Sequence, residues 1–326
     1  MRLKSIKAGG LITPCNVFLA PLAGYTNAVF RQMCFDLGAG LTVTEMVSAK
    51  GLCYDSDKTK DLLYVTEGYG GIKACQLFGS DPEFMRRAAE SEAVAPFELI
   101  DINMGCPMPK IYNNGEGSAL MNDIPLAEKI IKAVKRSGKA VSVKFRVGLT
   151  GDKIIASEFA RACAGAGADM ITIHGRTRDK IYAGEVNYGA IAEAKKAVEI
   201  PVIANGGVFC AEDAARLMDE TGADGVAVAR GAMYSPWLFA EITGKTLPDK
   251  KTLILNQLEN TRKIYGERFA CVFMRKMTAF YLKGSPNAVN YKIRLFKAAT
   301  TGEVEDIINE INVFRDELSC SRPCDI

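Results

Sequence analysis

The chain has 326 residues, 48% of them hydrophobic and 24% charged, and its formal net charge is +3, which is typical of a globular protein with one large and one smaller domain. No apolar run approaches the roughly 18 residues that cross a bilayer, and the first residues, MRLKSIKAGG, lack the apolar core of a secretory signal. We therefore expect a cytoplasmic protein with no membrane segment.

Residues 1–244 repeat one unit, a short apolar run followed by a Gly- or Asn-rich loop and an amphipathic helical stretch. Eight runs predict strands: VFLA from Val17, LTVTEM from Leu41, KACQLF from Lys73, ELIDIN from Glu98, AVSVKFR from Ala140, MITIH from Met170, PVIAN from Pro201 and GVAVA from Gly225. Apolar strands that alternate with helices indicate a parallel sheet covered on both faces, and eight units favour a closed (β/α)8 TIM barrel of the α/β class. An open doubly wound sheet is the alternative, but no G-x-G-x-x-G follows the first strand.

Residues 245–326 have a helical period without strand-rich runs, which predicts a small C-terminal helical domain with a break at SPNA. Between Arg262 and Lys297 there are nine basic residues and one acidic residue, Glu267, and aromatic residues are interleaved with them. Such a segment fits an RNA surface that contacts phosphates and stacks on bases. A solvated helical face is the alternative interpretation.

The loops after the seventh and eighth strands are the usual phosphate site of a barrel. Here they read Asn205-Gly206-Gly207 and Ala229-Arg230-Gly231. Glycines let backbone N–H groups approach a phosphate, and an arginine adds charge and a planar fork. These loops predict a phosphorylated ligand or cofactor; tight turns are the alternative.

Further polar groups point to a planar, anionic ligand. Lys144 and Arg146 share one side of the fifth strand, and we expect at least one of them to face an anion. Gln76 on the third strand suits the edge of a heterocycle, although a satisfied core amide fits nearly as well. The first strand leads into a flat apolar surface on which a flavin ring would fit, Pro21, Leu22 and Ala23.

Cys106 lies in the loop after the fourth strand, in the run Asn103-Met-Gly-Cys-Pro-Met-Pro-Lys110. Most cysteines are small buried hydrophobes, and we expect this of the other nine. A nucleophilic thiol would need a lowered pKa and a nearby base, but the only histidine, His174, is two strands away. We therefore expect Cys106 to be a protonated thiol that acts as a general acid.

A metal site is not expected. The single histidine argues against a histidine-rich centre and against a Ser-His-Asp triad. Cys320 and Cys324 are spaced too widely for the usual C-x-x-C half-site.

Segments from both predicted domains resemble the tRNA-dihydrouridine synthases, and among them the bacterial B-type branch. These segments are LAPLAGYTNAVFR, TEMVSAKGL, DINMGCPMPKIYNNGEGSALM, VKFRVG, ITIHGRTRDKIYAG, PVIANGG, ARGAMYSPWLF and RKMTAFYLKG. The combination of GCPMPK with HGRTR is highly specific, whereas ANGG and ARG are shared with other flavin barrels. The sequence departs from the family's pattern at Gly207, where an acidic residue is frequent, and at Met277 and Phe280, where His and Trp are frequent.

The resemblance implies an enzyme that reduces the C5=C6 bond of selected uridines in tRNA with FMN, which NADPH reduces in turn. It further implies that one set of residues holds FMN: Pro21, Leu22, Ala23, Gln76, Lys144, Asn205, Gly206, Gly207, Ala229 and Arg230. His174 would contact the cofactor phosphate or the stacked base. No obligate protein partner is implied.

By the same resemblance, C6 of the uracil would receive a hydride from the flavin and C5 would receive a proton from Cys106. Asn103 and Arg178 would bind the uracil edge, and the target base would be flipped out of the tRNA stack. The basic helical domain, with Arg275 and Lys276, would hold the tRNA backbone.

Two other functions remain open. One is a flavin barrel that acts on a free pyrimidine or another small enoate, which leaves the basic tail unexplained. The other is a non-catalytic RNA-binding protein on a degenerate barrel, which would bind no flavin.

Overall fold

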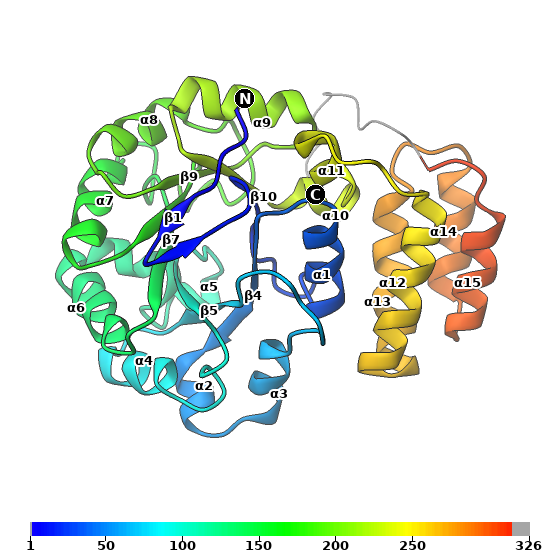
Figure 1. Ribbon diagram of the computed structural model, residues 1–326, viewed down its shortest axis with the longest axis horizontal. Coiled ribbons are helices and arrows are strands. Elements are labelled where there is room, and N and C mark those ends of the chain that lie inside the picture. The colour runs from blue at the N-terminus through cyan, green and yellow to red at the C-terminus, as the bar shows by residue number, and fades with distance from the viewer. Residues whose placement is uncertain (1, 315–326) are drawn as a thin grey trace.

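The computed structural model describes residues 2–314 and contains a closed barrel of eight parallel strands in the order β10-β3-β4-β5-β6-β7-β8-β9 (Figure 1). The strands are β3 Val17–Leu19, β4 Leu41–Ser48, β5 Ala74–Phe78, β6 Leu99–Met104, β7 Ala140–Arg146, β8 Met170–His174, β9 Val202–Asn205 and β10 Gly225–Val228. Each begins within one residue of its predicted start. The predicted fold class is therefore confirmed.

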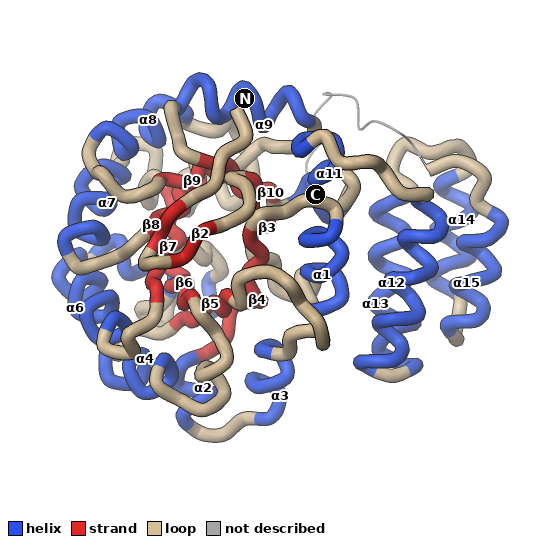
Figure 2. The backbone as a smooth tube through the Cα atoms, in the orientation of Figure 1, coloured by secondary structure: helices blue, strands red, loops and turns tan. Residues whose placement is uncertain are grey.

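Helices surround the barrel as an outer ring (Figure 2). They are α1 Ala28–Asp36, α2 Ala49–Cys53, α3 Asp57–Lys60, α4 Pro82–Ala89, α5 Pro109–Tyr112, α6 Ile124–Lys135, α7 Ala156–Gly165, α8 Tyr188–Lys196, α9 Ala211–Thr221, α10 Arg230–Tyr234 and α11 Leu238–Thr243, with short 3-10 helices at Asp61–Leu63 and Gly117–Asn122. Helix α6 illustrates why they form. The Asp123 side chain accepts the N–H of Leu126, and the buried face of the helix carries Ile130, Ile131 and Val134.

Two apolar clusters form the core. The larger lies between the strands and the outer helices and continues into the C-terminal helical segment, where it includes Met274 and Ile308. The smaller fills the barrel interior with residues such as Phe18, Leu99 and Met170. The interior cluster lies at the amino ends of the strands. The carboxyl ends carry polar side chains instead, as in other barrels whose sites lie at that face.

A two-stranded antiparallel hairpin, β1 Lys7–Ala8 and β2 Leu11–Ile12, crosses the barrel at the amino ends of the strands (Figures 1 and 2). Ile6 and Ala8 join the interior cluster. Gly9 in the turn has φ +56°, and a Cβ there would lie 2.6 Å from the Cβ of Ala140. Glycine is thus required for the hairpin to approach this closely.

Four helices follow the barrel: α12 Lys250–Tyr265, α13 Glu267–Tyr281, α14 Ala288–Lys297 and α15 Thr301–Glu310. Helix α12 contacts α1 and α13 contacts α10, while α14 and α15 pack on the side away from the barrel (Figure 1). The SPNA break separates α13 from α14. A further break at Gly266, which has φ +81°, separates α12 from α13 and is not marked by the hydrophobic pattern. The domain boundary at residue 244 stays a prediction, and Cys320 and Cys324 lie outside the described residues.

Within residues 2–314, no helix is long and apolar enough to span a bilayer. In the same range, no group of three or more His, Cys, Asp or Glu side chains could hold a metal ion.

Candidate functional site

The loops at the carboxyl ends of the strands bring most of the predicted site residues together. Strand register places Asn103 beside Lys144, Arg146 beside His174, and His174 beside Asn205. The predicted residues of β5 to β10 therefore converge on one mouth of the barrel.

The Cys106 loop is fixed by hydrogen bonds on both sides of the cysteine. Its N–H donates to Oδ1 of Asn103 at 2.9 Å, and its carbonyl oxygen accepts from the N–H and the hydroxyl of Ser118 at 3.1 and 2.8 Å. Gly117 must be glycine, because its φ is +60° and a Cβ would lie 2.9 Å from the Cys106 carbonyl oxygen. The half-buried thiol is thus held on a rigid loop.

Burial raises the pKa of the Cys106 thiol, and this effect outweighs a backbone N–H from Met108 and the positive charges of Arg146 and Lys144. The thiol is therefore protonated at neutral pH. A protonated, positioned thiol can donate a proton, whereas a nucleophilic cysteine needs a lowered pKa.

A polar chain runs from the barrel interior to this loop. Asn103 Nδ2 donates to Oε1 of Gln76 at 2.8 Å, and Gln76 Nε2 donates to Asp101 at 2.6 Å. Asp101 also accepts the hydroxyl of Ser142 at 2.5 Å. Asp101 was not among the predicted site residues, although a single acidic residue at an inward position of the apolar run ELIDIN was a usable signal.

Positive charge is concentrated around His174. Burial lowers the pKa of this histidine well below its usual value, and the charges of Arg146, Lys144, Arg176 and Arg230 lower it further. The imidazole is therefore neutral. The mouth presents a group of cations on β7, the β8 loop and the start of α10, which suits an anionic ligand.

Lys144 carries charge that is easily removed. Burial and the neighbouring Arg146 lower its pKa to about 8, while Asp101 opposes the shift. An anion bound beside the ammonium would favour the charged form.

Arg146 ties loops together rather than pointing freely into the mouth. Its guanidinium donates to the carbonyl oxygens of Gly105 at 2.9 Å, Thr177 at 3.0 Å and Ile181 at 2.8 Å. It thus joins the Cys106 loop to the loop after β8. Of the two basic residues on β7, Lys144 is the one left to meet a ligand.

The loops after β9 and β10 form the predicted phosphate cradle. Gly206 and Gly207 have φ values of +126° and +73°, and a Cβ on Gly206 would lie 3.0 Å from the His174 ring. Ala229 precedes α10, and Arg230 lies over the ring of Tyr182 with its Cζ 4.8 Å from the centroid. Asn205 donates its amide to the Ala227 carbonyl at 2.7 Å, so this side chain braces the two strands.

The turn after β3 carries Pro21, Leu22 and Ala23 to the same mouth, and both polar groups of the next residue are bound. Gly24 donates its N–H to Glu45 and accepts from Nζ of Lys276 at 2.7 Å. Burial raises the pKa of Glu45 and lowers that of Lys276. Lys276, predicted to contact tRNA, therefore connects α13 to the turn.

The other predicted substrate contacts also have partners in the protein. Arg178 stacks on Tyr112 with its Cζ 3.8 Å from the ring centroid. Arg275 donates to the carbonyl oxygens of Phe296 at 3.3 Å and Ala298 at 2.8 Å, at the end of α14. Arg178 lies in the loop after β8, near the mouth, whereas Arg275 does not belong to it.

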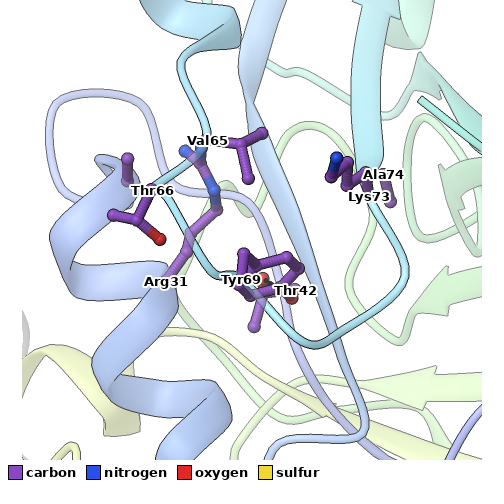
Figure 3. A pocket seen from close by; sticks show the side chains of 8 residues that line it. Arg31, Thr42, Val65, Thr66, Tyr69, Lys73 and Ala74 are labelled. Carbon is purple, nitrogen blue, oxygen red and sulfur yellow. Dashed lines mark hydrogen bonds between the residues drawn. The ribbon is translucent and has the colours of Figure 1, made fainter. Parts of the chain in front are cut away.

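A small pocket elsewhere contains none of the predicted site residues. Figure 3 shows Arg31 reaching from α1 toward Val65 and Thr66, with Thr42 and Tyr69 on the opposite wall. The buried guanidinium donates to the carbonyl oxygens of Thr26 at 2.7 Å and Tyr64 at 2.5 Å. Its role is structural, because it joins α1 to the segment before β5.

The mouth fits FMN. Positive-φ glycines and Arg230 offer N–H groups and charge for a phosphate, the turn at 21–23 offers an apolar surface, and Lys144 offers a donor for a polar ring edge. The amide of Gln76 is already engaged by Asp101 and Asn103. A Cβ at Gly206 would press on His174 and narrow this cradle.

Comparison with known proteins extends over most of the chain. A sequence model described as dihydrouridine synthase (Dus) matches residues 18–317. The chain is 34% identical over 307 residues to tRNA-dihydrouridine synthase B of Pseudomonas aeruginosa, covering 91% of this chain and 92% of that protein. It is 37% identical over 285 residues to tRNA-dihydrouridine synthase B of Pasteurella multocida, covering 84% and 86%.

Solved structures share the barrel at low sequence identity. The 6-hydroxypseudooxynicotine amine oxidase of Pseudomonas geniculata is 14% identical, with a TM-score of 0.57 over 74% of this chain and 49% of that one. A variant of NCR from Zymomonas mobilis is 18% identical, with a TM-score of 0.53 over 80% and 96%. At these identities the likeness concerns the fold.

Proposed function

Because the chain belongs to the dihydrouridine synthase family, we propose that it reduces the C5=C6 bond of uridines in tRNA to give 5,6-dihydrouridine. It is an oxidoreductase, and FMN is the cofactor that we propose for it. The observation that carries the proposal is a protonated, rigidly held Cys106 thiol in the same mouth as a cation-lined cradle that fits FMN.

FMN, when bound, supplies hydride chemistry for C6 of the uracil, and NADPH is the proposed source of its electrons. Cys106 holds the proton that C5 must receive, so hydride and proton together saturate the double bond. Because burial keeps the Cys106 thiol protonated, the proton is in place before the uracil binds. The positive charges of Arg146 and Lys144 lower the pKa of this thiol, so they stabilise the thiolate that is left once the proton has moved to C5; solvent then returns a proton to it.

The remaining residues bind and orient. Asn103 has one amide hydrogen on Gln76, and the other is directed to the uracil edge in this proposal. Arg178, already stacked on Tyr112, offers its guanidinium edge to a carbonyl oxygen of the base. Gly206, Gly207, Ala229 and Arg230 hold the cofactor phosphate, and the turn at Pro21, Leu22 and Ala23 supports the ring.

The helical segment is the proposed tRNA surface, with Arg268 and Lys297 among its exposed cations. Arg275 and Lys276 contribute by holding α13 in place rather than by free charge. A flipped uridine would then enter the mouth beside the turn that Lys276 binds.

The test is to map dihydrouridine in tRNA by mass spectrometry before and after removal of this protein from its cell. The proposal predicts the loss of dihydrouridine at one or more positions and its return when the protein is restored. An unchanged map, in a cell with no second enzyme for the same positions, would contradict the proposal.

A further inference from the structure

The polar chain below Cys106 has a defined direction. Asp101 and Gln76 are 3% and 1% exposed, and Ser142 is 1% exposed, so these groups exchange no hydrogen bonds with bulk water. Each must be satisfied within the protein. The orientation of one amide therefore constrains the next.

Asp101 sets this direction. Burial raises the pKa of its carboxyl, but the hydrogen bonds from Ser142 and Gln76 and the charge of Lys144 favour the ionised form, which only accepts hydrogen bonds. It accepts from Ser142 on one oxygen and from Gln76 Nε2 on the other. Gln76 must then turn its carbonyl oxygen away from Asp101, toward Asn103. A reversed amide would place two acceptors 2.6 Å apart.

The orientation of Gln76 fixes that of Asn103 and, through it, the Cys106 loop. Gln76 Oε1 accepts from Asn103 Nδ2, so Oδ1 of Asn103 faces the backbone N–H groups of Gly105 at 3.1 Å and Cys106 at 2.9 Å. If Asn103 were reversed, its NH2 group would face these two donors. The Cys106 loop would then lose both hydrogen bonds.

We infer that Asp101 is a positioning residue: it fixes the orientation of the Gln76 and Asn103 amides and thereby the place of the Cys106 thiol. It touches neither the thiol nor the proposed substrate. Its role in catalysis rests on the proposed function, whereas its role in ordering the loop does not.

Asp101→Asn tests the inference, because asparagine replaces one acceptor by a donor and no longer enforces a single orientation of Gln76. Hydrogen–deuterium exchange of a peptide covering residues 103–108 is the activity-independent measurement. We expect the N–H groups of Gly105 and Cys106 to exchange about tenfold faster, as for the loss of one hydrogen bond. The rate of uridine reduction should fall by a similar factor while the bound flavin is retained.

Asp169→Asn is the matched control. Asp169 is likewise a carboxylate that accepts two hydrogen bonds, from the N–H of Val141 and from Nζ of Lys135, each at 2.7 Å, but it lies at the amino end of the barrel. Its replacement should speed exchange at Val141 and leave residues 103–108 unchanged. If Asp101→Asn does not fold, Gln76→Met removes the next side chain in this series of hydrogen bonds. It should speed exchange of the same peptide, residues 103–108.

The outcomes separate the two hypotheses. Faster exchange confined to residues 103–108 supports the inference, even if wild-type protein proves inactive on tRNA and the proposed function fails. The inference would be overturned if Asp101→Asn left exchange in residues 103–108 unchanged. It would also be overturned if Asp101→Asn sped exchange of the peptide around Val141 as much as that of residues 103–108, whatever the activity.

Discussion

Two basic regions of this protein differ in how their charge is used. In the helical segment from Arg262 to Lys297, several cations are already engaged: Arg262 pairs with Glu259 at 2.6 Å and Arg294 pairs with Glu310. At the mouth, Lys144 and Arg230 share a small space around a neutral histidine. The mouth has fewer basic residues but the more strongly perturbed pKa values.

The difference teaches that an excess of basic residues in a sequence does not measure available charge. Arg275 and Lys276 were predicted to hold the tRNA backbone, yet both donate hydrogen bonds to carbonyl oxygens of the protein. Buried cations at the mouth cost desolvation free energy, which an anionic ligand would offset. We therefore assign the chemistry to the mouth and looser, salt-sensitive contacts to the helices.

The largest expected effect concerns the acid of the mouth. Cys106→Ala should lower the rate of uridine reduction at least about a hundredfold, because a general acid contributes that much, and it should retain FMN. Dihydrouridine formed on unmodified tRNA is the measurement, with flavin absorbance alongside. Cys53→Ala is the control, since Cys53 is also partly exposed but lies on α2. Equal rates for Cys106→Ala and wild type would refute the role.

A smaller effect should follow from the charge of Lys144. Its lowered pKa, about 8, means that the ammonium loses its proton as pH rises from 7 to 9. If the charged form binds FMN, affinity of the apoprotein should fall about tenfold over that range. The Lys144→Arg variant keeps its positive charge over this range, so its affinity for FMN should not change with pH. A profile that is equally steep in both proteins would exclude Lys144 as the titrating group.

The exposed cations of the helices should have a weaker effect. Replacing Arg268 and Lys297 by glutamine should weaken tRNA binding severalfold and reduce the slope of log affinity against log salt by about 1 to 2, as for one or two lost phosphate contacts. Filter binding over a series of salt concentrations measures both quantities. An unchanged slope of log affinity against log salt would indicate that tRNA binds to another face of the protein.

The smallest effect is expected for Arg275→Gln. Loss of its hydrogen bonds to the end of α14 should lower the free energy of unfolding by about 1 kcal/mol, with little change in the salt slope. Thermal and denaturant unfolding would measure this. A large change in the salt slope of tRNA binding, with an unchanged free energy of unfolding, would instead indicate that Arg275 contacts tRNA.

Much of the barrel could be predicted from the sequence because its strands are short apolar runs that alternate with helices. The hairpin at Lys7–Ile12 escaped prediction, since two-residue strands carry too little periodicity. The break at Gly266 escaped because the apolar pattern continues through it.

The candidate site could be predicted as a set of loops but not as a set of contacts. Cys106 and the glycines after β9 follow from their positions after strands. The directions of Arg146, Lys276 and Asp101 depend on segments far away in the chain, such as Ile181 for Arg146 and Gly24 for Lys276. No local pattern encodes those partners.

The most direct test of the division between mouth and helices is a single-turnover experiment. Protein loaded with FMN and reduced by NADPH is mixed, without oxygen, with unmodified tRNA or with free uridine or orotate, and flavin reoxidation is followed by absorbance. We predict that tRNA reoxidises the flavin and gains dihydrouridine, while the free compounds react far more slowly. Rapid reoxidation by uridine or orotate, with no reaction of tRNA, would contradict the account.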